Sequence, residues 1–221
     1  MDKKWTKAKL AAVIDHSVLR AAADEVTLKK ACQEAREFGF ASICVNPCWV
    51  PLCAAELAGS GTIVCAVVGF PMGTSATSIK AEEARLAVSE GAGEIDVVIN
   101  IGKAKSEDWN YIAQDIAAVV KAAKPAKVKT IIETCVLDRQ EKILACRAAA
   151  AAGADYVQTS TGFGTGGALV EDIVLMRQTL GGVAQVKAAG GIRTRAECIA
   201  MLEAGAERIG TSSSLDIMTE H

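Results

Sequence analysis

The chain has 221 residues, a formal charge of −2, and a composition that is 51% hydrophobic but only 4% aromatic. The small net charge argues against a nucleic-acid or anionic-membrane partner, and no apolar run approaches the ~20 residues that cross a bilayer. Residues 1–10 are charged and lack the apolar region of a signal peptide, so we expect a cytoplasmic protein.

Short β-type runs alternate with amphipathic segments along the whole chain. Several runs are apolar almost throughout, as at residues 63–68, which is typical of parallel strands covered on both faces. In chain order the predicted strands are residues 12–16, 41–46, 62–70, 94–100, 128–134, 156–161, 184–190 and 208–212.

The amphipathic segments carry the start and stop signals of helices. Asp24 can cap the first of them, and a glycine that can leave the helix in a left-handed conformation follows several others. The predicted helices are residues 24–38, 78–90, 108–123, 137–152 and 194–204. Eight strands alternating with helices predict one (β/α)8 TIM barrel over residues 1–221. An open doubly wound sheet is the alternative, but it usually has fewer strands and a phosphate-binding motif after the first one, where none stands here.

The eight cysteines are scattered, and no cluster has the spacing of a redox or zinc motif. A chain of this length does not need disulfides, so we expect structural or free thiols and no metal site.

Two charges lie inside otherwise apolar strands: Asp96 and Lys187. A buried charge costs several kcal/mol unless it is paired, so we expect the two to pair at the carboxyl ends of the strands, where barrel active sites lie. The pair can be structural, or it can be a proton-transfer couple whose pKa values burial adjusts. An inward lysine can also form an imine with a carbonyl substrate.

Glycines and serines follow the last two predicted strands, at Gly190-Gly191 and Ser212-Ser213. Loops in these positions form the usual phosphate site of the barrel. The glycine-rich residues 162–167 can add N–H donors, or they can be only a flexible loop.

Eight motifs, in order along nearly the whole chain, resemble those of the deoxyribose-phosphate aldolases: residues 14–19, 43–47, 67–71, 94–100, 131–134, 159–163, 187–194 and 208–213. The resemblance implies an aldehyde-lyase that reversibly cleaves 2-deoxy-D-ribose 5-phosphate to D-glyceraldehyde 3-phosphate and acetaldehyde through a lysine imine. It implies no metal or other cofactor, a small phosphorylated sugar or aldehyde as partner, and a homodimer or larger homo-oligomer.

The resemblance also implies roles for individual residues. Asp96 matches the proton-relay aspartate, and Lys187 matches a second lysine that lowers the pKa of the imine lysine. The phosphate-binding positions correspond to Gly162, Gly190, Gly191, Ser212 and Ser213. The substrate pocket corresponds to Asp15, Ser17 and Cys44.

Gln158 departs from the family, because it stands where the imine lysine is found. An amide nitrogen is not nucleophilic, so we expect impaired aldol cleavage. Three hypotheses remain open: an aldolase silenced by one Lys-to-Gln change, a related sugar-phosphate lyase that uses Lys187 and Asp96 for a different reaction, and a non-catalytic sugar-phosphate-binding protein.

Overall fold

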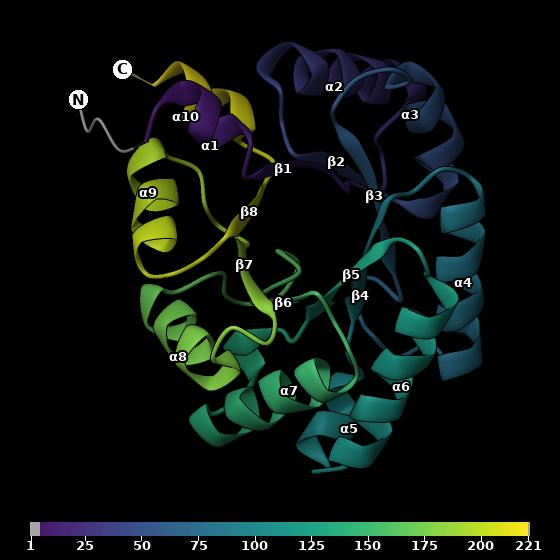
Figure 1. Ribbon diagram of the computed structural model, residues 1–221, viewed down its shortest axis with the longest axis vertical. Coiled ribbons are helices and arrows are strands. Elements are labelled where there is room, and N and C mark those ends of the chain that lie inside the picture. Colours follow the sequence, from purple (N-terminus) through teal and green to yellow (C-terminus); the bar gives the residue numbers. More distant parts are fainter. Residues whose placement is uncertain (1–4, 221) are drawn as a thin grey trace.

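The computed structural model describes residues 5–220 and forms a closed barrel of eight parallel strands in sequence order. Figure 1 shows the strands at the centre and the helices in a ring around them. The strands are β1 (Ile14–Val18), β2 (Ser42–Val45), β3 (Ile63–Val68), β4 (Glu94–Val98), β5 (Lys127–Ile131), β6 (Tyr156–Gln158), β7 (Gln185–Ala189) and β8 (Arg208–Thr211). The predicted barrel is therefore confirmed, and the open sheet is excluded because β1 pairs with β8.

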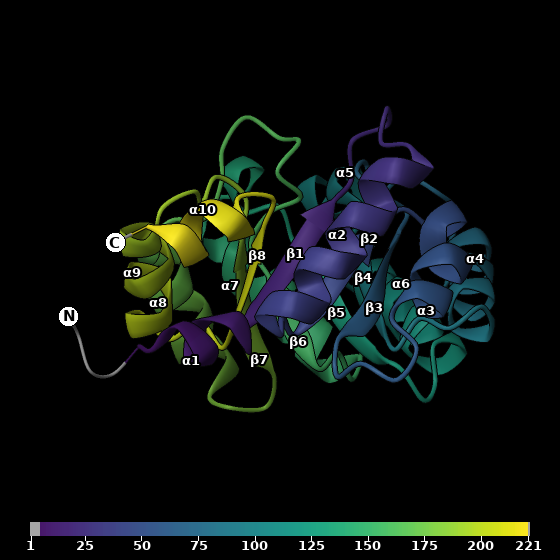
Figure 2. The same cartoon turned by 90° about the horizontal axis from the view of Figure 1, so that it is seen from above.

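The helices follow the strands around the outside, and two 3-10 turns, η1 (Pro47–Trp49) and η2 (Thr134–Val136), interrupt the loops. The helices are α1 (Lys7–Ala11), α2 (Glu25–Phe38), α3 (Val50–Glu56), α4 (Thr77–Ser89), α5 (Ile101–Lys105), α6 (Trp109–Ala122), α7 (Arg139–Ala151), α8 (Val170–Leu180), α9 (Arg195–Glu203) and α10 (Ser214–Thr219). Figures 1 and 2 show α1 and α10, the first and last helices of the described residues, on the same side of the barrel, where they contact each other.

The predicted helix boundaries rest on local capping, and the structure contains these caps. The carboxylate of Asp24 accepts the backbone N–H of Thr27 at 2.9 Å, and Gly39 ends α2 with a left-handed φ of 70°. Thr194 and Glu197 form a reciprocal capping box at the start of α9. These contacts fix where α2 and α9 begin relative to the preceding strands.

The strand predictions were correct in number and order but wrong at several ends. The first strand begins at Ile14 instead of residue 12, because α1 and a turn occupy the preceding residues. The sixth strand ends at Gln158 instead of residue 161, because the chain leaves the sheet there to enter the glycine-rich loop. The helix α8 was not predicted; no side chain caps its start at Leu169.

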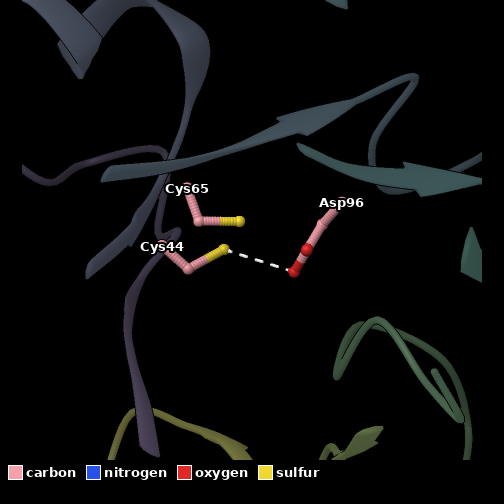
Figure 3. Close-up of side chains that lie close together, drawn as sticks. All are labelled: Cys44, Cys65 and Asp96. Carbon is pink, nitrogen blue, oxygen red and sulfur yellow. Dashed lines mark hydrogen bonds between the residues drawn. The ribbon is translucent and has the colours of Figure 1, made fainter. Parts of the chain in front are cut away.

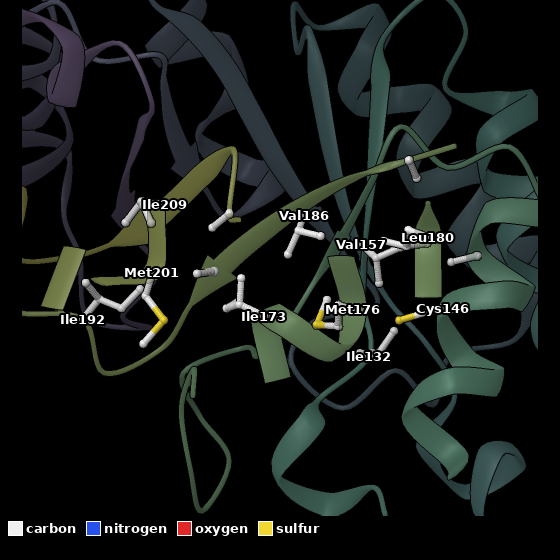
Figure 4. Close-up of a cluster of buried hydrophobic side chains, with 14 of the residues drawn as sticks. Ile132, Cys146, Val157, Ile173, Met176, Leu180, Val186, Ile192, Met201 and Ile209 are labelled. Carbon is white, nitrogen blue, oxygen red and sulfur yellow. The ribbon is translucent and has the colours of Figure 1, made fainter. Parts of the chain in front are cut away.

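The main core lies between the barrel and its helices, because the outward side chains of the strands are apolar. In Figure 4, Ile173 and Met176 of α8 and Cys146 of α7 pack around Val157 and Val186 of the neighbouring strands β6 and β7. All eight cysteines are free thiols. Within residues 5–220, no helix combines the length and apolar character that a bilayer crossing requires.

A buried ion pair also joins two helices. The Lys80 ammonium of α4 lies 2.6 Å from the Asp115 carboxylate of α6 and donates to the carbonyl of Val98 at 2.9 Å. It therefore ties both helices to the end of β4.

Candidate active site

The interior of the barrel is polar because side chains alternate along each strand. On β4, Ile95 and Val97 point outward into the apolar core, while Glu94 and Asp96 are buried on the other face, among charged groups of other strands. The other inward-facing charges are Asp15 of β1, Lys129 of β5, Lys187 of β7 and Arg208 of β8. Three carboxylates and three cations thus meet in one network, with a formal charge of zero.

Lys187 lies at the end of this network that is nearest the carboxyl ends of the strands. Its ammonium nitrogen lies 2.6 Å from one carboxylate oxygen of Asp15 and 2.6 Å from one of Asp96. The predicted Asp96–Lys187 pair is therefore present. Gly210 on β8 makes room for it, because a Cβ there would lie 3.0 Å from the Cε atom of Lys187.

Lys129 and Arg208 complete the network on its other side, toward the amino ends of the strands. These two residues and Glu94 were not predicted from the sequence. The Lys129 ammonium lies 2.6 Å from Glu94 and 2.8 Å from Asp96, and Arg208 contacts Asp15 at 2.6 Å and Glu94 at 3.0 Å. One signal was available in the sequence: Lys129 lies inside the predicted strand 128–134, and in the structure it is the register partner of Asp96. It was obscured because Lys127, two residues earlier, is exposed and makes the strand look solvent-facing.

The network keeps Asp96 and Lys187 charged. Burial alone would raise the pKa of Asp96, but the Lys129 and Lys187 ammonium groups outweigh it and hold the pKa below its ordinary value. Burial would likewise lower the pKa of Lys187, but the carboxylates of Asp15 and Asp96 raise it above its ordinary value. Lys187 is therefore held as an ammonium ion at neutral pH.

Gln158 ends β6 and is the register partner of Lys187 on the neighbouring strand. Its side chain is 4% exposed, and its amide nitrogen donates to the carbonyl of Ser160 at 2.9 Å. Its amide oxygen has no hydrogen-bond partner in the described part of the chain. The residue is thus beside Lys187 in the wall, as the resemblance implies for the imine position, and it offers no nucleophile.

Among residues 5–220, one trio of side chains brings three potential metal ligands within 4.8 Å of one another: Cys44, Cys65 and Asp96. Figure 3 shows both sulfur atoms beside the carboxylate, with the Cys44 thiol donating to Asp96 at 3.6 Å. The Lys129 ammonium, however, lies 3.2 Å from the Cys65 sulfur and 2.8 Å from Asp96. Burial also raises the pKa of the Cys65 thiol. The trio therefore fits an ammonium partner better than a metal ion, which needs thiolates.

Four of the five predicted phosphate-binding residues have backbone N–H groups without acceptors; the fifth, Ser213, donates its N–H to the Thr211 hydroxyl at 2.9 Å. Within the described chain, no hydrogen bond engages the N–H groups of Gly162, Gly190, Gly191 or Ser212. Gly190 and Gly191 have φ values of 90° and 78°, a left-handed conformation that side chains disfavour. Free N–H groups at adjoining loop ends form a site suited to an anion.

The loop after β6 folds over these glycines. The N–H of Ala168 donates to the carbonyl of Gly190 at 2.9 Å, and a Cβ on Gly167 would lie 2.3 Å from that same oxygen. Phe163, on the same loop, meets Phe70 of the β3–α4 loop edge to face, with ring centroids 5.3 Å apart. The loop therefore forms one side of the opening.

A cavity of about 810 Å³ opens at the carboxyl ends of the strands. Ten of the eleven predicted site residues line it: Ser17, Cys44, Asp96, Gln158, Gly162, Lys187, Gly190, Gly191, Ser212 and Ser213. Asp15 does not line it but contacts Lys187 from below. The other charged lining residues are Arg20 and Arg193, so Asp96 is the single carboxylate in the wall formed by the described residues.

The structure is thus a TIM barrel in which a buried lysine–aspartate network opens into a cavity that is edged by free N–H groups. The chain belongs to the DeoC/LacD aldolase family, whose model matches residues 9–219.

Relatives of this chain cover nearly its whole length. It is 52% identical to a deoxyribose-phosphate aldolase of Carboxydothermus hydrogenoformans, over 96% of this chain and 95% of the relative. It is 53% identical to one of Brevibacillus brevis, over 93% of each chain. Among solved structures, a tetrameric deoxyribose phosphate aldolase of Aeropyrum pernix is similar with a TM-score of 0.90 and 30% identity, covering 96% of this chain and 91% of that one.

Proposed function

We propose that this chain binds 2-deoxy-D-ribose 5-phosphate as the aldolases of its family do, and that Gln158 impairs its cleavage to D-glyceraldehyde 3-phosphate and acetaldehyde. The observation that carries the proposal is the position of Gln158, which is beside Lys187 in a wall whose other functional groups are all present. The names of the relatives support the substrate.

Each group of the site has a step to perform in this proposal. The free N–H groups of Gly162, Gly190, Gly191 and Ser212 hold the phosphate, which orients the sugar along the cavity. Asp96 and Lys187 exchange protons with the reacting end of the sugar. Carbon–carbon bond cleavage needs an electron sink, and an imine nitrogen at position 158 would supply it. The amide of Gln158 cannot form that bond.

Lys187 is a poor substitute for the missing imine lysine. Nucleophilic attack requires the neutral amine, but Asp15 and Asp96 each lie 2.6 Å from its ammonium nitrogen and raise its pKa. The hypothesis of a different reaction through a Lys187 imine is therefore not favoured by the geometry. Borohydride reduction in the presence of acetaldehyde tests it directly, since a trapped adduct that maps to Lys187 would restore that hypothesis.

The main experiment compares aldol cleavage by the unaltered chain and by Gln158→Lys. We expect the lysine to raise the rate by more than the ~10²–10⁴-fold contribution that is typical of one acid–base group. Gln185→Lys is the matched control, because it introduces the same side chain at an exposed position on the neighbouring strand β7. Equal rates for the unaltered chain and Gln158→Lys would refute the proposed role of position 158.

Binding separates an impaired aldolase from a protein with no sugar-phosphate site. Calorimetry should detect 2-deoxy-D-ribose 5-phosphate bound to the unaltered chain without turnover. We also expect a cytoplasmic homo-oligomer, an assembly supported by the tetramer of the Aeropyrum pernix relative; light scattering of the purified protein tests the assembly.

A further inference from the structure

Glu133 stands out because it is a buried carboxylate without a cation. It is 3% exposed, and in the described part of the chain no lysine or arginine forms an ion pair with it. Its φ of 55° and ψ of 66° are also unusual, since a left-handed backbone is unfavourable for a residue with a side chain. Burial and backbone strain both cost free energy, so the surrounding contacts must stabilise this arrangement.

One of those contacts is local, since the Cys135 thiol donates to a Glu133 carboxylate oxygen at 3.7 Å, and the others are made to the loop after β6. One carboxylate oxygen of Glu133 accepts the hydroxyl of Thr161 at 2.5 Å, and both oxygens face the Thr161 N–H at 3.3 and 3.4 Å. The Thr161 hydroxyl oxygen in turn accepts the N–H of Phe163 at 3.0 Å. Glu133 thus holds the residues on both sides of Gly162, directly at Thr161 and indirectly at Phe163.

This arrangement decides which N–H of the loop remains available. The N–H groups of Thr161 and Phe163 are both engaged, whereas that of Gly162 makes no hydrogen bond in the described chain. Gly162 lines the cavity and packs against Gly190, whose own N–H is also free. Among residues 161–163, the Gly162 N–H is therefore the donor left for an anion, and it is on the cavity wall.

We propose that Glu133 is a positioning residue for phosphate recognition: it fixes the β6–α8 loop so that the Gly162 N–H joins the donors of Gly190, Gly191 and Ser212. This rests on the proposed sugar-phosphate site and adds a residue that does not line the cavity. Glu133 acts on the phosphate end of the ligand, so its loss affects phosphorylated ligands and leaves unphosphorylated ones unchanged.

The test is calorimetry on the full chain with 2-deoxy-D-ribose 5-phosphate and inorganic phosphate. In Glu133→Gln we expect affinity for both to fall about tenfold, since a charge-assisted acceptor is lost. Glu107→Gln is the matched control, because Glu107 also has a positive φ but is exposed in the α5–α6 loop, and no described contact joins its side chain to the β6–α8 loop. Hydrogen exchange should also become faster at the amides of Thr161 and Phe163, the two that these contacts engage, in Glu133→Gln but not in Glu107→Gln.

The opposite end of the contact provides a second variant should Glu133→Gln fold poorly. Thr161→Val keeps the side-chain shape but removes the hydroxyl, and it should give the same loss. In the Gln158→Lys background, either variant should raise KM for the phosphate ester and leave kcat/KM for plain 2-deoxyribose unchanged. Equal losses for both sugars, or unchanged phosphate affinity in both variants, would overturn the proposal. Absence of any phosphate binding to the unaltered chain would instead refute the sugar-phosphate site itself.

Discussion

Gln158 and Lys187 are register partners on adjacent parallel strands, and both line the same cavity. A lysine at position 158 would therefore lie beside an ammonium ion that two carboxylates hold in its charged form. Like charges disfavour each other, so the pKa of that lysine would fall below its ordinary value. The neutral amine needed for imine formation would then exist near neutral pH.

The pH profile of cleavage tests this relationship. The Gln158→Lys chain should become active over the pH range in which its lysine loses a proton. The additional change Lys187→Met should shift that range to higher pH by about one to three units, because the neighbouring charge is gone. The measurement is kcat/KM against pH for both chains. An unshifted pH range would mean that Lys187 does not influence position 158 through its charge.

Lys129 should be essential for stability. Lys129→Met leaves Glu94 and Asp96 buried with one cation fewer, and we expect the free energy of unfolding to fall by about 3–5 kcal/mol. Lys127→Met, on the exposed end of the same strand, should change it by less than about 0.5 kcal/mol. Urea denaturation of the two variants makes the comparison, and similar losses in both would contradict a special role for Lys129.

Gly167 should tolerate no side chain. A Cβ there would lie 2.3 Å from the carbonyl oxygen of Gly190, so Gly167→Ala must displace the loop and should cost about 1–3 kcal/mol of stability. It should also weaken inorganic phosphate binding, measured by calorimetry. Gly61→Ala serves as the control, because no atom lies within 4 Å of its added Cβ; phosphate affinity that survives Gly167→Ala would argue against this loop as part of the site.

His16 should make the free energy of unfolding depend on pH in the acidic range. It lies outside the barrel network, with Nδ1 3.0 Å from the Ser214 hydroxyl and Nε2 3.5 Å from Glu34, and burial lowers its pKa to about 4. The unfolded chain takes up a proton below about pH 6.5 while the folded chain does not, so stability falls from there down to about pH 4, by up to about 3 kcal/mol. His16→Asn should flatten that part of the curve of unfolding free energy against pH.

The barrel could be predicted from the sequence because strand and helix patterns alternate along the whole chain. The ends of the strands could not, because they depend on where tertiary turns begin: the residues after Gln158 continue an extended-looking pattern but enter the loop that Glu133 holds. A similar limit applies to α8, whose start no side chain caps.

Asp96 and Lys187 of the charged network could be predicted from the sequence, because apolar residues flank both of them. Glu94 and Arg208 could not be predicted as members of the network, since they stand at the first position of their strands, where charged residues are usually exposed. Only closure of the barrel brings the two side chains together, with an Arg208 guanidinium nitrogen 3.0 Å from a Glu94 carboxylate oxygen. Their pairing is a property of the closed fold that no local pattern contains.

The network that contains Lys187 and Asp96 has a formal charge of zero, so the surplus positive charge among the described residues of the cavity wall comes from Arg20 and Arg193. Such an imbalance creates a positive potential that extends into solvent and accelerates the arrival of anions, more strongly in dilute salt. Capture of a phosphate ester is therefore favoured before any contact with the loops is made, whereas an uncharged sugar reaches the opening by diffusion alone.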